Sequence, residues 1–382
     1  VRAWLNDCLT NHGDCSLTRR GLAGGFTGPT RLLEIRNQGE KVRVRAMVRS
    51  RPVQYLTLSH CWGQSTHCKL LSTNLQQYQQ FIPTSHLSRT FREAILFTAA
   101  LGFSYLWIDA LCIIQDSASD WQAECKIMGD IYAHSVLNIA ATASRDGDGG
   151  LFRSPRGSPP CVIHFQNEDS RPFIFLTHDE LDYYKRIDSA PLASRAWVLQ
   201  ERLLSPRTVH FTSNQVFWEC YSSCDAEILP DTIFPEASND HLGKTIIVEK
   251  YSQGASNSLH CTWARLVRSY TQCQLTFGRD KLPAISALAS RLASQWGLEP
   301  GSYLSGLWKE SLVGDLLWSS SSNNSSICAE RAPSWSWVRL NGQIYTGKSP
   351  TQCHISILSA NTCTVGDPFG MAPTGSIILQ AP

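Results

Sequence analysis

The stretch FSYLWIDALCIIQDSASDWQAECKIMGDIYAHSVLNIAATA, residues 103–143, predicts a strand, a helix and a second strand. Its opening FSYLWI is a short apolar strand that ends at Asp109. Ser119 and Gln122 then have the spacing of a capping box at a helix start. Large side chains recur every three or four residues, as on one face of an amphipathic helix, at Trp121, Cys125, Met128 and Tyr132. The closing SVLNIAATA is apolar on both faces, which is typical of a strand buried in a parallel sheet.

The sequence upstream adds one more strand and one more helix. Residues 53–59, VQYLTLS, form a strand candidate, and residues 88–101, SRTFREAILFTAAL, place their apolar side chains on one helical face. Thr90 and Glu93 have capping-box spacing, and Gly102 is a natural helix stop. Strand, helix, strand, helix and strand in fewer than 100 residues predict an open α/β sheet flanked by helices, with right-handed crossovers.

The flanking sequence suggests three units. Residues 1–50 are a strand-rich lead-in, in which PTRLLEIRNQGEKVRVRAMV predicts two short strands around a glycine turn. Residues 51–225 form the core, where SRAWVLQERLLSPR predicts a helix that ends at Ser205, and TVHF and QVFWEC predict a hairpin. Residues 226–382 are expected to form a mixed α+β extension packed on the core. Within it we predict a helix over residues 301–318 and a strand at APSWSW.

The composition excludes several classes of partner. Thirty-four basic residues face 32 acidic ones, so the net charge of +2 favours neither nucleic acid nor a membrane surface. Fourteen cysteines lack the dense spacing of a small secreted domain, and no run of eighteen apolar residues occurs. We therefore expect a cytoplasmic protein with reduced thiols. Val1 in place of Met indicates a trimmed or partial N-terminus.

Polar side chains end two of the predicted strands. Ser59, His60, Cys61 and Trp62 follow one strand, and Asp109 follows the next. Ligands of open α/β sheets bind beyond the carboxyl ends of the strands, so we expect these residues on one rim of a binding site. Adjacent residues of a strand point to opposite faces, which argues against a dyad of His60 and Cys61.

Two of these residues also have simpler interpretations. Asp109 could serve as an N-cap or turn residue that accepts backbone hydrogen bonds. Cys61 and Cys112 are better explained as buried, inert thiols, because His60 is poorly placed to activate Cys61. A distant histidine such as His86, His134 or His210 could act as the base, but nothing in the sequence singles one out.

A series of motifs resembles the fungal heterokaryon incompatibility (HET) domain proteins. The motifs that stand in the family's order include YLTLSHCWG, TFREAI, YLWIDALCIIQD, DWQAECKIMGDIY, SRAWVLQERLLSPR, FWEC and APSWSW. This resemblance implies a fungal protein of non-self recognition, innate immunity and programmed cell death.

The HET core in turn resembles the TIR fold, a flavodoxin-like open parallel sheet. Some TIR domains hydrolyse NAD through the glutamate of a W-C-x-x-E helix. WVLQE places Glu201 four residues after Trp197, with Val198 where that pattern has Cys. The resemblance implies Glu201 as a catalytic residue. Together with the strand-end rim, it leads us to expect Asp109 as a second catalytic residue and Ser59, His60, Cys61, Trp62 and Trp197 as substrate-binding residues. NAD would be a substrate, and no cofactor is expected.

Three alternatives remain open from the sequence. Glu201 could be an ion-pair partner of Arg195 or Arg202 that only holds its helix in place. The protein could then be a non-catalytic module that signals death by self-association with copies of itself or with a partner signalling protein. It could also be a biosynthetic enzyme that acts on a small molecule through Cys61, His60 or Asp109.

CLTNHGDC supplies three zinc-type ligands, Cys8, His12 and Cys15. A structural zinc site needs four ligands, and Cys220 or Cys224 completes it only if the fold brings one of them near. The sequence alone favours packing thiols, so we assign no metal.

Overall fold

The structure is a computed structural model. It describes residues 1–15, 26–47, 53–63, 68–153, 162–166, 172–176, 183–228, 242–248, 256–320, 326–347, 354–364 and 366–381.

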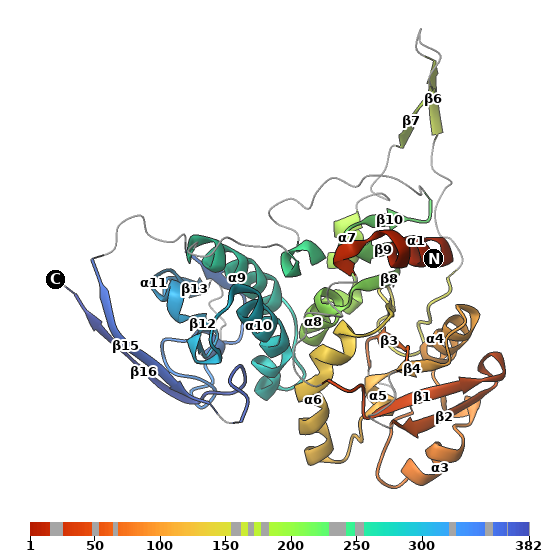
Figure 1. Cartoon of the computed structure of the whole chain (residues 1–382), viewed down its shortest axis with the longest axis horizontal. Helices are drawn as coiled ribbons and strands as arrows, with labels where there is room; N and C mark the ends of the chain where they lie inside the picture. Colours follow the sequence, from red (N-terminus) through yellow and green to blue (C-terminus); the bar gives the residue numbers. More distant parts are fainter. Residues whose placement is uncertain are drawn as a thin grey trace.

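An eight-stranded mixed sheet forms the centre of the protein, in the order β10-β9-β8-β5-β3-β4-β1-β2 (Figure 1). Its strands are β1 (Arg31–Arg36), β2 (Lys41–Ala46), β3 (Leu56–Ser59), β4 (Tyr105–Trp107), β5 (Leu137–Ala140), β8 (Arg207–Phe211), β9 (Val216–Cys220) and β10 (Cys224–Ala226). The four central strands β8, β5, β3 and β4 run parallel. The outer pairs are antiparallel. The α/β class is therefore confirmed, but the predicted parallel sheet is mixed at both edges.

The parallel strands have a flavodoxin-like order. Numbered along the chain, β3, β4, β5 and β8 stand in the spatial order 2-1-3-4. The chain leaves β3 toward β4 and later returns past β3 to β5, so right-handed crossovers place the connecting helices on opposite faces. These helices are α4 (Arg89–Ala100) and α6 (Ala118–Ala133). The order reverses between β3 and β5, and the carboxyl ends of these two strands are where such sheets bind ligands.

Both predicted capping boxes are wrong by two residues. Ser88 caps α4 by accepting from the Phe91 backbone N–H, and Ser117 caps α6 by accepting from the Asp120 backbone N–H. Thr90 and Glu93 bind the loop after β5 instead: the Gly150 N–H donates to Thr90, and the N–H groups of residues 151 and 152 donate to Glu93. Hydrophobic periodicity fixes which face of a helix is buried but leaves its first residue open.

Several further helices surround the sheet: α1 (Arg2–Asn11), α3 (Leu75–Gln80), α5 (Asp109–Cys112), α7 (Tyr183–Asp188) and α8 (Ala196–Leu204). The last ends at Ser205, as predicted. Strands β6 (Val162–Gln166) and β7 (Pro172–Leu176) form a hairpin that projects from the body (Figure 1).

The C-terminal part contains α9 (Ser256–Thr271), α10 (Pro283–Trp296), α11 (Leu312–Asp315) and three small sheets. The sheets are formed by β11 (Tyr303–Leu304) with β12 (Leu307–Trp308), β13 (Trp318–Ser320) with β14 (Ile344–Thr346), and β15 (Ser356–Cys363) with β16 (Thr374–Gln380). Helices α9 and α10 lie between the large sheet and β15–β16 (Figure 1). Helix α10 packs on α6 and α8.

Two predictions for this part are wrong. Residues 301–318 form the β11–β12 hairpin before the short α11, because Ser305 and Gly306 both have positive φ (49° and 97°), as a tight hairpin turn requires. APSWSW is not a strand: Trp337 begins a 3₁₀ turn, and its indole donates to the Gly306 carbonyl. No helix of the described residues has both the length and the apolar character needed to cross a membrane.

Candidate functional site

A chain of hydrogen bonds crosses the point where the strand order reverses. Thr57 Oγ1 donates to Asn138 Oδ1 (3.0 Å), and Asn138 Nδ2 donates to Ser59 Oγ (3.1 Å). Ser59 Oγ then donates to Glu201 Oε2 at 2.5 Å. Thr57 and Ser59 belong to β3, Asn138 to β5 and Glu201 to α8, so the chain joins two parallel strands to the helix that covers them.

Glu201 is buried and carries a raised pKa. Its residue is 4% exposed, and burial raises the pKa of its carboxyl to about 7. The nearby Asp109 acts in the same direction, while Arg195 and the hydrogen bond from Ser59 oppose it. At neutral pH the carboxyl therefore populates both protonation states, which is a property of many catalytic acids and bases.

Glu201 does not form the predicted ion pair with either arginine. Arg202 pairs with Glu219 at 2.9 Å and with Asp188 at 2.7 Å, and the Arg195 side chain donates to the His60 carbonyl. Among the ion pairs of the described residues, none includes Glu201. The hydrogen-bond chain from Ser59, rather than a guanidinium, holds this carboxyl in place.

Asp109 stands at the tip of β4 and joins the neighbouring strand end. Its Oδ2 accepts from the indole N–H of Trp62 at 2.8 Å, and its Oδ1 lies 3.6 Å from His60 Nδ1. Oδ1 also accepts from the Ala110 backbone N–H at 2.7 Å, so Asp109 has the expected turn role as well. Because β3 and β4 are parallel, the two strand ends meet at one rim. The residues predicted for this rim are therefore neighbours in space.

His60 and Cys61 point to opposite sides of β3. The His60 ring meets Phe91 of α4 edge-on at 4.9 Å, whereas Cys61 packs with Leu192 and Val198 on the side of α8. Burial raises the pKa of the Cys61 thiol and raises that of Cys112 to about 12. Neither thiol has the lowered pKa that a nucleophile needs, in agreement with the interpretation as packing residues.

Trp197 contacts the C-terminal part of the protein. Its indole N–H donates to Asp280 (3.4 Å), and its ring meets Trp121 of α6 edge-on at 6.4 Å. These contacts hold α8 against α6 and against the segment that leads into α10. A substrate contact for Trp197 stays a prediction.

The hollow beside Ser59 is small. It has a volume of about 20 Å³ and is lined by Ser59, Asn138, Thr142 and His210, among others. A water molecule needs roughly 10–15 Å³ in such a measure, so this hollow holds about one water. A dinucleotide does not fit in this hollow in this conformation.

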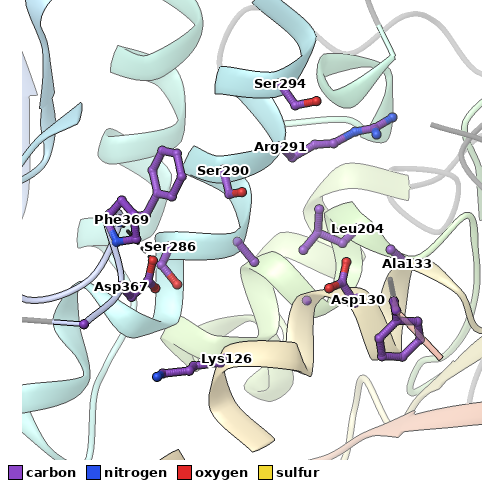
Figure 2. A pocket seen from close by; sticks show the side chains of 15 residues that line it. Lys126, Asp130, Ala133, Leu204, Ser286, Ser290, Arg291, Ser294, Asp367 and Phe369 are labelled. Atoms are coloured by element: carbon purple, nitrogen blue, oxygen red, sulfur yellow. Dashed lines mark hydrogen bonds between the residues drawn. The ribbon is translucent and has the colours of Figure 1, made fainter. Parts of the chain in front are cut away.

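A larger groove of about 420 Å³ lies between α6, α10 and the loop at residues 366–369 (Figure 2). Lys126 and Asp130 of α6 line one wall, and Ser290 and Arg291 of α10 line the other. Of the residues predicted for the site, none is among those that line it. The groove and the rim are therefore separate features.

Sequence reasoning missed Asn138 and Thr57, although one signal was present. Asn138 is the only amide in the apolar run VLNIAA, and a buried amide in a central strand requires partners. It also missed a second buried polar group on β8 and β9, where Glu219 accepts from Arg202 and lies 3.2 Å from His210.

Comparisons with known proteins match the part of the chain that contains this rim. Residues 55–201 match the family model "Heterokaryon incompatibility protein (HET)". The match begins just before β3 and ends at Glu201, so it contains Ser59, Asp109 and Asn138. Over 97 residues the chain is 34% identical to the "Heterokaryon incompatibility protein 6, OR allele" of Neurospora crassa, which covers 23% of this chain. The chain spans 14% of that protein's length. No solved structure matches the chain.

Proposed function

We propose that this chain, whose residues 55–201 match the heterokaryon incompatibility (HET) family model, acts in fungal non-self recognition that leads to programmed cell death. The similarity to an incompatibility protein of Neurospora crassa supports this role. The observation that carries the proposal is the family match itself, which spans the whole polar rim from Ser59 to Glu201.

For the mechanism, we propose that Glu201 serves in the hydrolysis of NAD when the site opens. Cleavage of the bond between nicotinamide and ribose develops positive charge on the ribose, and a nearby carboxylate stabilises that charge. Glu201 lies at the switch point of a flavodoxin-like sheet, with Asp109 close enough to raise its pKa. Asp109 in turn accepts a hydrogen bond from the Trp62 indole and would orient this ring at the rim.

The closed conformation supports a second candidate, a death-signalling module without catalysis. The hollow beside Ser59, the partner of Glu201, has room for about one water, so a larger substrate enters this hollow only if α8 moves away from β3. In a non-catalytic protein the bond from Ser59 to Glu201 would serve only to hold α8 on the sheet.

NAD consumption by the purified protein separates the two candidates. The protein is assayed as a monomer and after clustering through a fused, inducible dimerisation domain. Glu201→Ala is compared with Asp280→Ala, which removes another buried carboxylate that contacts α8 but lies outside the rim. Circular dichroism and thermal unfolding establish that both variants are folded.

Catalysis predicts that the wild type and Asp280→Ala consume NAD and that Glu201→Ala does not. The signalling module predicts no NAD loss from any of the three proteins, together with cell death in a fungal host that persists in Glu201→Ala. Absence of cell death on expression of the clustered wild type would contradict the proposed role itself.

A further inference from the structure

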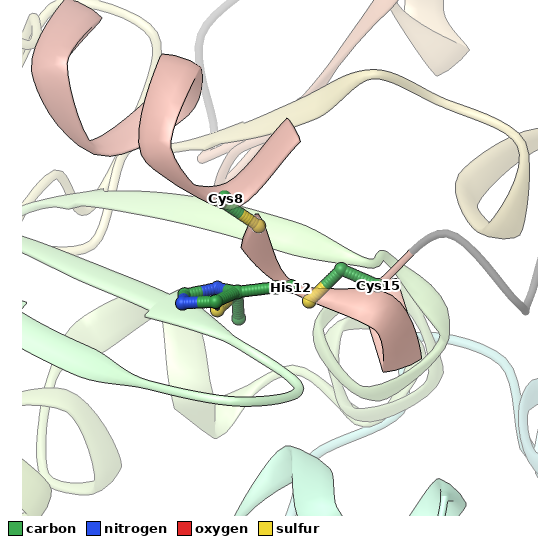
Figure 3. Close-up of side chains that lie close together, drawn as sticks. Cys8, His12 and Cys15 are labelled. Atoms are coloured by element: carbon green, nitrogen blue, oxygen red, sulfur yellow. The ribbon is translucent and has the colours of Figure 1, made fainter. Parts of the chain in front are cut away.

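Four side chains that bind zinc in many proteins converge where the N-terminal segment meets the edge of the large sheet (Figure 3). Cys8 and His12 lie one helical turn apart at the end of α1, Cys15 follows them, and Cys220 is the last residue of β9. Their ligand atoms all lie within 4.8 Å of one another. Tetrahedral zinc with Zn–S distances of about 2.3 Å places its ligand atoms about 3.8 Å apart. A small contraction of this cluster therefore gives the geometry of a zinc site.

The surroundings of His12 match those of a zinc ligand. His12 Nδ1 lies 3.3 Å from the Cys220 sulfur, so this nitrogen faces the centre of the cluster. The other ring nitrogen, Nε2, lies 3.6 Å from the Asp7 carboxylate. Zinc-bound histidines usually donate their second N–H to a carboxylate, which fixes the tautomer and the orientation of the ring. Asp7 is placed to do this for His12.

The positive charge beside the cluster supports thiolates. Arg207 is 1% exposed, its Nε donates to the Cys8 sulfur at 3.0 Å, and its Nη2 donates to the Cys15 carbonyl. Among the ion pairs of the described residues, none gives Arg207 a carboxylate partner. A buried guanidinium requires a counter-charge. Three thiolates and one Zn²⁺ carry a net charge of −1, which Arg207 balances.

We propose that Cys8, His12, Cys15 and Cys220 bind one zinc ion in a closed tetrahedral site. All four positions are filled by the protein, which is the arrangement of structural rather than catalytic zinc. The Ser223 backbone N–H donates to the Cys220 sulfur at 3.2 Å and supports the ligand from the sheet side. The site holds α1 on β9, and it does not depend on the proposed hydrolysis of NAD.

Cys220 completes a set that the sequence left at three ligands. It stands 208 residues after His12, so only the fold brings the two together. Cys224, the other candidate, instead packs with Tyr183, Phe217 and Ala226. Within the described part of the chain, Cys8, Cys15 and Cys220 are free thiols. The proposal differs from the expectation, made from the sequence, that these are only packing thiols.

Metal content of the purified full chain tests the site. The protein is expressed with added zinc, desalted, and analysed by inductively coupled plasma mass spectrometry. We expect about one zinc per wild-type chain and a loss of most of it in Cys15→Ser. Cys224→Ser is the matched control and should keep its zinc. Cobalt exchanged into the wild type should give the spectrum of tetrahedral Co²⁺ with thiolate charge-transfer bands.

Asp7→Asn tests the site in a variant that is expected to fold, because Asp7 is exposed. Loss of an outer carboxylate typically weakens zinc binding about 10–100-fold, which competition with a chromophoric chelator measures. The proposal is overturned if the wild type takes up neither zinc nor cobalt. It is also overturned if non-reducing peptide mapping finds a disulfide among the three cysteines, or if Cys224→Ser loses zinc as fully as Cys15→Ser.

Discussion

Replacement of Glu201 by glutamine should stabilise the protein at high pH and leave it nearly unchanged at low pH. Burial raises the pKa of Glu201 from 4.5 to about 7. Between these values the native state holds a proton that the unfolded chain releases, so the free energy of unfolding falls as the pH rises. The stabilisation is complete below about pH 4.5 and lost above pH 7. This pKa shift corresponds to about 3 kcal/mol of unfolding free energy.

Glu201→Gln mimics the protonated acid, since its amide oxygen accepts from Ser59 and carries no charge. We expect the variant to be more stable than the wild type by about 3 kcal/mol at pH 8 and by almost nothing at pH 4. Urea unfolding at several pH values measures this difference. The difference between the two proteins is the relevant quantity because His260, whose pKa is raised by its hydrogen bond to Asp315, produces a slope of the same sign in both.

Glu93 offers a control with the opposite sign. Although burial opposes its ionisation, the Arg89 side chain and the N–H groups of Phe152 and Leu151 hold the pKa of Glu93 below its usual value. Ionised Glu93 stabilises the native protein above its unfolded pKa, and this stabilisation is lost as the pH falls through its native pKa. Glu93→Gln should therefore lower the free energy of unfolding most at neutral pH. A Glu201→Gln variant that is equally or less stable than the wild type at pH 8 would show that the native pKa of Glu201 is not raised and would refute the reasoning.

Three further substitutions test the packing. Gly129→Ala on α6 places a methyl 2.3 Å from the Ala287 Cβ of α10. It should lower the free energy of unfolding by about 1–3 kcal/mol, as urea unfolding measures, and a second change, Ala287→Gly, should restore the stability. Arg202→Met leaves Glu219 buried without its guanidinium and should cost about 3–5 kcal/mol by the same measurement, whereas a further Glu219→Leu should recover most of the loss. Gly306 has a φ of 97°, and the methyl of Gly306→Ala would lie 2.8 Å from a neighbouring side chain. This variant should lose roughly 1–3 kcal/mol of unfolding free energy, seen as a thermal midpoint lower by several degrees.

The sequence predicted that these two strand ends lie side by side because the signals for it are local. A strand that ends in Ser59 and another that ends at Asp109 are visible in short runs of residues, and the crossover helix between them requires that they be parallel. The contact of Glu201 with Ser59 spans 142 residues and came from the motif resemblance rather than from periodicity. Asn138 was missed because one amide in an apolar strand has no sequence pattern of its own.

The errors share a physical cause. The hairpin at residues 303–308 depends on two residues of positive φ, and the apolar side chains around it are spaced as in a helix. Trp337 is held by a hydrogen bond to Gly306, a contact that the alternation in APSWSW does not reveal. The fourth zinc-type ligand, Cys220, likewise depends on where β9 lies relative to α1. Local patterns predict elements, whereas these features depend on how distant elements pack.

Burial of Glu201 means that the closed form, in which α8 lies on β3, disfavours the catalytic state of this carboxyl. The desolvation that raises its pKa disfavours the carboxylate that would stabilise a charged ribose, so an active site requires α8 to move away from β3 and admit water. Glu201→Gln favours the closed form, while Glu201→Ala removes the group that Ser59 holds and weakens closure. A catalytic protein loses NAD hydrolysis and cell death in both variants. A module that signals by opening loses cell death only in Glu201→Gln and keeps or increases it in Glu201→Ala. The pair of variants thus separates the need for a carboxylate from the need for an open site, which neither variant does alone.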